Sequence, residues 1–562
     1  MSVLESLKLA PFNLNDADID WVSSTLAAFS TEDRLRQLII QISIGDDADA
    51  TRGMMEAKLG GLCRMMGGDI EAASQATRAA LEAAEVPPFV TADIEGGGHL
   101  SPVFTRVQSP LGLAAANDLA LSEAGVELLA KEARALGFNW TFTPCIDINQ
   151  NFNSAIVGTR SYGADIETIL TQGALHVKVM QRNGVAACAK HWPGEGYDPR
   201  DQHLVTTVNP LSFDEWDKAY GRLYRGMIEA GVLSVMSAHI ALPSFAEKCG
   251  VPEGLERYRP ASLSKLLNED LLRGHLGFNG LIISDATPMA GMGDWAARAS
   301  TVPECIENGC DVFLFSDNLE RDLSHLRAGL ADGRLSAARV EAAVTRILGL
   351  KAALGLHRMS VDERILPIEE AKKIVKSAPH LETAHRTTSK AVTLVKNVSG
   401  ILPISTARHR RVTVLSNGTP PFFPGMPRKR LDRFEECLAE RGFEVSRYDP
   451  ASPPTRENTD LLIYVFAAES SLTLSRIFLD WRAEQPSMRQ TMTRYWHDIP
   501  TIMVSFGHPY YLFDAPRVKT YINAYSTIED AQEAVVNKML GNEPFEGVSP
   551  VDAFCGLADA RY

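Results

Sequence analysis

Short apolar runs alternate with longer amphipathic segments through residues 1–350. Each run is frequently β-branched and apolar at mostly consecutive positions, which is typical of strands buried on both faces of a parallel sheet. The runs are Leu38–Ile42, Gly61–Cys63, Pro88–Ala92, Trp140–Cys145, Val185–Ala189, Leu233–Ser237, Leu281–Ser284 and Val312–Phe315. The clearest helices predicted between them are Ala116–Leu136, Asp165–Arg182, Phe213–Ala230 and Pro260–Leu276. This alternation favours a (β/α)₈ barrel of the TIM type.

The pattern changes after Gly355, where the last barrel helix is predicted to end. Residues 1–356 therefore form the barrel domain, and the polar stretch 357–385 is predicted to link it to a second domain over residues 386–562. That second part predicts helices at Leu431–Arg441 and Glu529–Leu540, and strands at Val412–Leu415, Leu461–Phe466, Thr501–Val504 and Thr520–Asn523. A smaller α/β domain with an open, mostly parallel sheet is expected.

The composition is that of an ordinary globular protein, with 45% apolar and 22% charged residues. The formal net charge of −14 disfavours nucleic acid and anionic membranes as partners. No apolar run approaches the roughly 18–20 residues of a membrane span, and the N-terminus shows no secretory signal. A cytoplasmic protein is therefore predicted, and the sequence does not indicate an oligomeric state.

Chemically active side chains follow most of the predicted barrel strands. In a barrel of this kind the active site forms at the carboxyl ends of the strands. One Asp after a strand is more often a helix cap or a turn residue, but here six strand ends carry such groups. They are Asp93, Asp147, Lys190 with His191, His239, Asp285 and Asp317. The pattern predicts a site on this rim.

Four motifs occur in order along the same strand ends. They are Thr-Ala-Asp93-Ile-Glu95-Gly-Gly, Gly-Thr-Arg160-Ser-Tyr-Gly, Ala-Lys190-His191-Trp-Pro-Gly-Glu195-Gly with Asp201-Gln-His203, and Gly-Leu-Ile-Ile-Ser-Asp285-Ala-Thr-Pro-Met. This ordered set resembles glycoside hydrolase family 3, and more narrowly its β-N-acetylhexosaminidase (β-N-acetylglucosaminidase) branch. Two departures stand out, because Gly98-His99-Leu100-Ser101 replaces an expected Arg-Val-x-Arg and Glu195 replaces the usual His.

The resemblance implies a retaining glycoside hydrolase that removes β-linked N-acetylhexosamine from the non-reducing end of a carbohydrate. Asp285 would be the nucleophile, and His203 oriented by Asp201 would supply and recover the proton. An imidazole exchanges protons near neutral pH, and an adjacent carboxylate orients the ring. No cofactor and no metal are implied, and the second domain carries no residue assigned to catalysis. The implied sugar-binding group is Asp93, Arg160, Lys190 and His191.

Three alternatives remain open at this stage. A glycoside phosphorylase on the same scaffold is favoured by the histidine acid, because a neutral imidazole does not repel phosphate as a carboxylate does. A metal-dependent barrel hydrolase is a second alternative, although the first strand is not followed by a His-x-His pair. A non-catalytic sugar-binding protein is the third. The candidate ligands for a metal are His191, His203, His239, Asp93 and Asp285.

Overall fold

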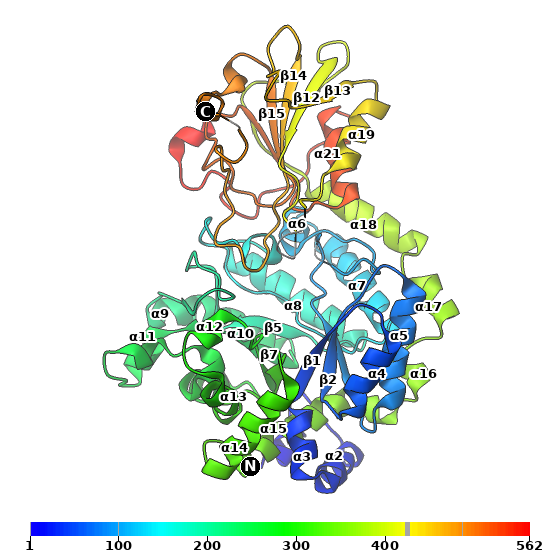
Figure 1. The fold of residues 1–562 in the computed structure, drawn as a ribbon, viewed down its shortest axis with the longest axis vertical. Helices are drawn as coiled ribbons and strands as arrows, with labels where there is room; N and C mark the ends of the chain where they lie inside the picture. The colour runs from blue at the N-terminus through cyan, green and yellow to red at the C-terminus, as the bar shows by residue number, and fades with distance from the viewer. Residues whose placement is uncertain (1, 99, 422–426, 486) are drawn as a thin grey trace.

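The computed structural model describes residues 2–98, 100–421, 427–485 and 487–562. Figure 1 shows two bodies stacked along the long axis, with the barrel below and the second domain above it. The N-terminus lies at the far end of the barrel, and the C-terminus lies in the second domain. None of the described helices is both long and apolar enough to cross a bilayer.

Eight parallel strands close into the predicted barrel. Five pair in the order β10-β1-β2-β3-β4 and three in the order β5-β7-β9, and bridges at Trp140–Ala186 and Ile283–Val312 join the two sets. Strands β3, β5, β7 and β9 are buried at every position, as expected for strands covered on both faces. The bounds are β1 Ile39–Ile44, β2 Gly61–Met65, β3 Phe89–Ala92, β4 Trp140–Thr141, β5 Cys188–Trp192, β7 Ser234–Ser237, β9 Leu281–Ser284 and β10 Phe313–Leu314.

Helices surround the barrel, and the first three helices of the chain, α1, α2 and α3, pack against α15. The predicted helix 165–182 is confirmed as α8, whose first turn Asp165 caps through the N–H of Thr168. The predicted helix 260–276 is instead divided into a short turn at Ala261–Leu263 and a wide π-type helix at Leu266–His275. The bounds are α1 Val3–Ser6, α2 Asp16–Ala28, α3 Thr31–Gln37, α4 Ala48–Glu56, α5 Ile70–Ala83, α6 Pro110–Ala115, α7 Leu119–Ala135, α8 Ile166–Arg182, α9 Phe213–Trp216, α10 Arg222–Glu229, α11 Pro243–Lys248, α12 Ala290–Gly293, α13 Arg298–Glu307, α14 Leu319–Asp332 and α15 Ala337–Ala353.

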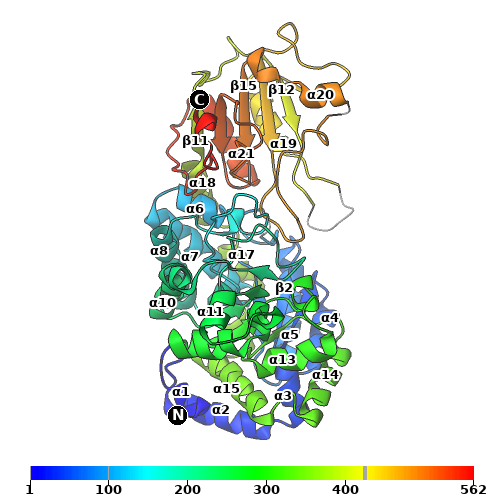
Figure 2. The same ribbon diagram turned by 90° about the vertical axis from the view of Figure 1, so that its left-hand side faces the viewer.

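The segment between the two bodies is helical. Helix α16 (Val361–Arg364) and α17 (Ile368–Ile374) lie against α5, and α17 also packs on α7. Helix α18 (Ala378–Ala391) then bridges α6 and α7 of the barrel to α21 (Glu529–Met539) of the second domain. Figures 1 and 2 both show α18 at the junction of the two bodies.

The second domain contains one six-stranded sheet in the order β11-β16-β15-β14-β12-β13. The sheet is parallel except for β11, which pairs antiparallel with β16. The four predicted strands are present, whereas β11 and the edge strand β13 were not predicted. The bounds are β11 Thr393–Asn397, β12 Arg411–Ser416, β13 Glu444–Arg447, β14 Leu461–Phe466, β15 Thr501–Ser505 and β16 Thr520–Asn523, with α19 Asp432–Glu440, α20 Met488–Met492 and α21 Glu529–Met539. The predicted fold class, a barrel followed by a smaller α/β domain, is confirmed.

Candidate active site

Asp285 follows β9 directly and is 7% exposed. Its Oδ1 accepts the backbone N–H of Ala286 at 2.7 Å, whereas its buried Oδ2 has no hydrogen-bond partner among the described residues. Asp285 is not a helix cap, because α12 begins after Met289 and has no side-chain cap. The structure therefore leaves one buried carboxylate oxygen unpaired at the rim of the barrel.

Three histidines act on the ionisation of this carboxylate. Burial alone would raise the pKa of Asp285, but the charges of His191, His239 and His203, together with the Ala286 N–H, outweigh burial and lower this pKa below its ordinary value. Asp285 is therefore ionised at neutral pH. An ionised carboxylate is the form that attacks carbon or stabilises a developing cation.

His203 and Asp201 form a close pair on the loop after β5. The Asp201 Oδ1 lies 2.7 Å from the His203 Nδ1 and also accepts the His203 backbone N–H at 2.9 Å. Asp201 is buried, whereas the His203 side chain is 18% exposed. The ring is therefore held through Nδ1, and Nε2 is the nitrogen that remains for a substrate.

The loop of this pair is hydrogen-bonded to the chain that follows Asp285. The N–H of Ala290 donates to the His203 carbonyl at 3.1 Å, and the N–H of Gly291 donates to the Gln202 carbonyl at 3.2 Å. A Cβ on Gly291 would lie 2.4 Å from that Gln202 carbonyl oxygen, so this approach requires glycine. The fold thus brings the Asp201–His203 pair and the segment carrying Asp285 together.

A network of ion pairs lies on the neighbouring part of the rim. Arg160 contacts both oxygens of Glu95 at 2.9 Å, and the Lys190 Nζ lies 2.7 Å from Glu95 and 2.6 Å from Asp93. Burial opposes the ionisation of Glu95, but the charges of Arg160 and Lys190 prevail and lower the pKa of Glu95. The predicted residues Asp93, Arg160 and Lys190 are thus brought into one cluster, with the Asp93 side chain 55% exposed.

Glu95 is the member of this cluster that the sequence did not single out. It occurs in the quoted Asp-x-Glu segment, and the spacing of two from Asp93 was the available signal. Without it, Arg160 would lose its ion pair with Glu95, and Lys190 would keep its pair with Asp93. Removing one partner from such a buried network costs about 3–5 kcal/mol, so Glu95 holds Arg160 and Lys190 in place.

The His191 ring is oriented by Asp147, which contacts its Nδ1. The His191 Nδ1 lies 2.6 Å from the Asp147 Oδ2, while the Asp147 Oδ1 accepts the N–H of Glu195 at 2.8 Å. Despite complete burial, the charge of His191 and these hydrogen bonds lower the pKa of Asp147. Asp147 is thus an orienting residue, and the ring leaves Nε2 for another partner.

Glu195, which stands where the family usually has His, is buried at the base of the same loop. Its Oε2 accepts the Gln202 Nε2 at 3.2 Å, and its Oε1 has no partner among the described residues. Burial, followed by the charges of Asp147 and Asp201, raises the pKa of Glu195 well above its ordinary value. Burial therefore disfavours the charged form of the Glu195 side chain. His99, in the other departure, lies outside the described residues.

Two further strand-end residues, His239 and Asp317, have partners of their own and do not belong to the ion-pair network. His239 bonds to the Ala286 carbonyl through Nε2 at 3.0 Å and to the Ser262 hydroxyl through Nδ1 at 2.8 Å. It therefore supports the backbone beside Asp285. Asp317 pairs with Arg321 and Arg298 instead, and its side chain is 52% exposed.

Among the described residues, a group with metal-ligand side chains consists of Cys145, Asp147 and His191, whose candidate atoms lie within 4.8 Å of one another. These three side chains already bond to one another, because the Asp147 Oδ2 also accepts the Cys145 thiol at 3.2 Å. This set differs from the one expected for a metal-dependent hydrolase, since it lacks His203 and Asp285.

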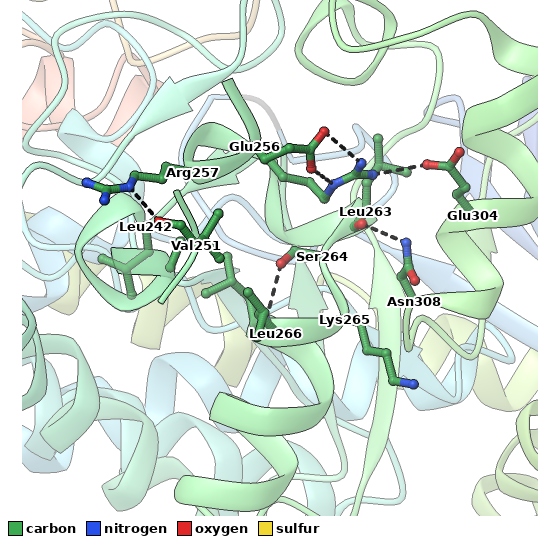
Figure 3. A pocket seen from close by; sticks show the side chains of 13 residues that line it. Leu242, Val251, Glu256, Arg257, Leu263, Ser264, Lys265, Leu266, Glu304 and Asn308 are labelled. Carbon is green, nitrogen blue, oxygen red and sulfur yellow. Dashed lines mark hydrogen bonds and ion pairs between the residues drawn. The ribbon is translucent and has the colours of Figure 1, made fainter. Parts of the chain in front are cut away.

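A pocket of about 370 Å³ lies elsewhere, between α11 and the π-type helix. Figure 3 shows it with Leu242, Val251 and Leu263 among its walls. Arg259 in its wall is already paired with Glu256 and Glu304. The pocket shares no residue with the group at the barrel rim, so we do not assign the chemistry to it.

Comparisons with known proteins agree with the fold. Residues 30–350 match the model of the glycosyl hydrolase family 3 N-terminal domain. Over an alignment covering 99% of both chains, the protein is 40% identical to a β-N-acetylglucosaminidase/β-glucosidase of Cellulomonas fimi. It is 32% identical to a β-hexosaminidase of Stenotrophomonas maltophilia, with 47% of this chain and 76% of the relative aligned.

Among solved structures, the β-glucoside phosphorylase BglX bound to 2FGlc superposes with a TM-score of 0.92 at 34% identity, covering 98% of this chain and 100% of that one. The barrel, the ordered strand-end groups and these matches define a glycosidase of the barrel class. The chain belongs to glycosyl hydrolase family 3, which confirms the resemblance found in the sequence.

Proposed function

We propose that this family 3 glycosidase removes β-linked N-acetylhexosamine, N-acetylglucosamine above all, from the non-reducing end of its substrate by a retaining double displacement. The observation that carries the proposal is the buried, ionised Asp285, whose Oδ2 has no hydrogen-bond partner among the described residues. Backbone hydrogen bonds connect the segment after Asp285 to the loop of the Asp201–His203 pair. A carboxylate nucleophile and a proton donor are the two groups that this reaction requires.

The proposed first step forms a bond between an Asp285 oxygen and the anomeric carbon while the glycosidic carbon–oxygen bond breaks. The proton on the His203 Nε2 moves to the leaving oxygen, and a glycosyl ester of Asp285 results. In the second step the now neutral His203 takes a proton from water. The water oxygen bonds to the anomeric carbon, and the ester bond to Asp285 breaks.

Asp93, Arg160, Lys190 and His191 are proposed to bind the sugar. The exposed Asp93 carboxylate accepts from hydroxyl groups, whereas Lys190 and Arg160 donate to them. The ion pair of Lys190 with Asp93 and the pairs of Arg160 and Lys190 with Glu95 fix the positions of these groups before substrate arrives, which reduces the ordering cost of binding. Because Ser101 replaces an expected arginine, the sugar is held with one cation fewer at that point.

The sugar preference is tested with a panel of aryl β-glycosides that share one leaving group: N-acetylglucosaminide, N-acetylgalactosaminide, glucoside and xyloside. The proposal, supported by the full-length similarity to the Cellulomonas fimi enzyme, expects the highest kcat/KM for the N-acetylglucosaminide. We expect a margin of at least about 10-fold over the xyloside, which lacks both the 2-acetamido and the hydroxymethyl group, since each group bound in the transition state contributes about 1–3 kcal/mol. A higher kcat/KM for the xyloside would contradict the proposed specificity.

Phosphorolysis is a second candidate, favoured by the close superposition on a β-glucoside phosphorylase. The acid is a histidine, and after the first step it is neutral, so it does not repel an incoming phosphate as a carboxylate does. The test compares turnover in phosphate with turnover in a phosphate-free buffer of equal ionic strength. Phosphorolysis predicts faster turnover in phosphate and a sugar 1-phosphate product, whereas hydrolysis predicts equal rates and free sugar in both buffers.

A further inference from the structure

The second domain reaches the site through the seven-residue stretch 467–473, here called the bracing segment. It follows β14, and the views in Figures 1 and 2 both show an orange loop of the second domain descending onto the top of the barrel. The bracing segment is anchored in its own domain, because the N–H of His508 donates to the Ala468 carbonyl at 2.7 Å. From this anchor it makes hydrogen bonds to three separate barrel loops.

The first contact is with the loop after β3, which carries Asp93 and Glu95. The buried Glu469 accepts the N–H of Gly98 on its Oε2 at 2.9 Å. Its other oxygen accepts the Thr527 hydroxyl of its own domain at 2.7 Å. A Cβ on Gly98 would lie 2.6 Å from the Thr527 Oγ1, so the barrel loop needs glycine for this approach.

The second contact is with the turn after β4, which carries Arg160. Ser470 and Thr159 bond to each other twice: the Thr159 N–H donates to the Ser470 Oγ at 2.8 Å, and the Ser470 N–H donates to the Thr159 Oγ1 at 3.1 Å. Both residues are buried. A Cβ on Gly158 would lie 1.9 Å from the Ser470 Oγ, so the second domain is seated directly against the residue pair preceding Arg160.

The third contact is with the loop after β5, which carries the proposed acid/base pair. The backbone N–H of Thr473 donates to the Asp201 Oδ2 at 2.8 Å. The other Asp201 oxygen holds His203. A backbone N–H of the second domain therefore orients the Asp201 carboxylate. That carboxylate in turn orients the His203 imidazole.

We infer that the bracing segment is a positioning element of the active site, with Glu469 and Ser470 as its positioning side chains. It fixes the loops of Asp93, Arg160 and Asp201 relative to one another, and this rests on the roles proposed for those residues above. Such an element acts through geometry, because displacement of a binding group by about 1 Å can cost a large factor in rate. Both oxygens of Glu469 are hydrogen-bonded within the protein, one to each domain, which is the arrangement expected of a positioning residue.

The first test is Glu469→Gln. A Gln side chain keeps one acceptor oxygen for Thr527, so the contact within the second domain is preserved. Its amide NH₂ faces the N–H of Gly98, and because two donors cannot pair, the hydrogen bond between the domains is lost. We expect KM for the aryl glycoside to rise about 10-fold, with kcat reduced less than about 3-fold, because the displaced loop binds the sugar. The matched control is Glu440→Gln, which removes an ion pair with Arg433 on α19.

The second test, Ser470→Ala, removes the acceptor for the Thr159 N–H and keeps the inference testable if the Gln variant does not fold. It too should raise KM more than it lowers kcat, whereas Ser446→Ala on the edge strand β13 should change neither. A variant that loses thermal stability but keeps both constants would show that the contacts are only structural and would overturn the inference. Because Asp285→Asn reports on the mechanism by itself, a failure here is distinguishable from a failure of the proposed function.

Discussion

Asp285→Asn is expected to lower kcat by at least ~10³-fold while the protein remains folded. The amide that replaces the carboxylate cannot form the glycosyl ester, and its oxygen carries no charge to stabilise the developing cation. The substitution is nearly isosteric, and the amide oxygen can still accept the Ala286 N–H that Oδ1 accepts now. Steady-state kinetics with an activated aryl N-acetylglucosaminide, together with circular dichroism, measures both parts of the expectation.

The matched control for this variant is Asp317→Asn. Asp317 also follows a barrel strand, but it pairs with Arg321 and Arg298 and is half exposed, so kcat should stay within about 2-fold of wild type. A slow-reacting fluorosugar donor should label Asp285 covalently. Wild-type activity in Asp285→Asn, or a label on another residue, would exclude Asp285 as the nucleophile.

His203→Ala is expected to lose activity in proportion to how poor the leaving group is. A nitrophenolate leaves with little protonation, whereas a sugar hydroxyl needs a nearly complete proton transfer. The loss on natural disaccharides should therefore be the ~10²–10⁴-fold typical of general acid catalysis, and it should be smaller on activated aryl glycosides. Asp201→Ala should show the same dependence in milder form, because Asp201 orients the ring.

The pH profile supplies a second measurement for this prediction. The wild-type kcat/KM profile should contain a limb that is absent in His203→Ala. The control is His275→Ala, because His275 also pairs with an aspartate, Asp217 at 3.3 Å, but on the outer surface. Equal losses on every leaving group would rule out His203 as the acid, and Glu195, a buried carboxyl group whose pKa is raised by burial, would be tested next.

Much of the barrel was predictable because its physical requirements act locally on the sequence. A strand covered on both faces must be apolar at consecutive positions, so β9 at Leu281–Ser284 and β14 at Leu461–Phe466 coincide with their predicted bounds. Strands β11 and β13 were missed because they are more exposed than buried strands such as β9 and β14. Strand β13 lies at the edge of the sheet and is exposed at three of its four positions. A polar edge strand has no apolar run to reveal it.

The sequence by itself also determined which residue types stand at the strand ends, because parallel strands bring their carboxyl ends to one rim. Asp285 and Lys190 were found in that way, whereas His203 was indicated by the motif that resembles the family. The contacts of these residues were decided only by the tertiary structure. Gly98 and Glu469 are 371 positions apart in the chain, and the bond to Asp201 comes from a backbone N–H that any residue but proline offers. Such contacts leave no mark on local hydrophobic pattern, so only the docking of the second domain on the barrel creates them.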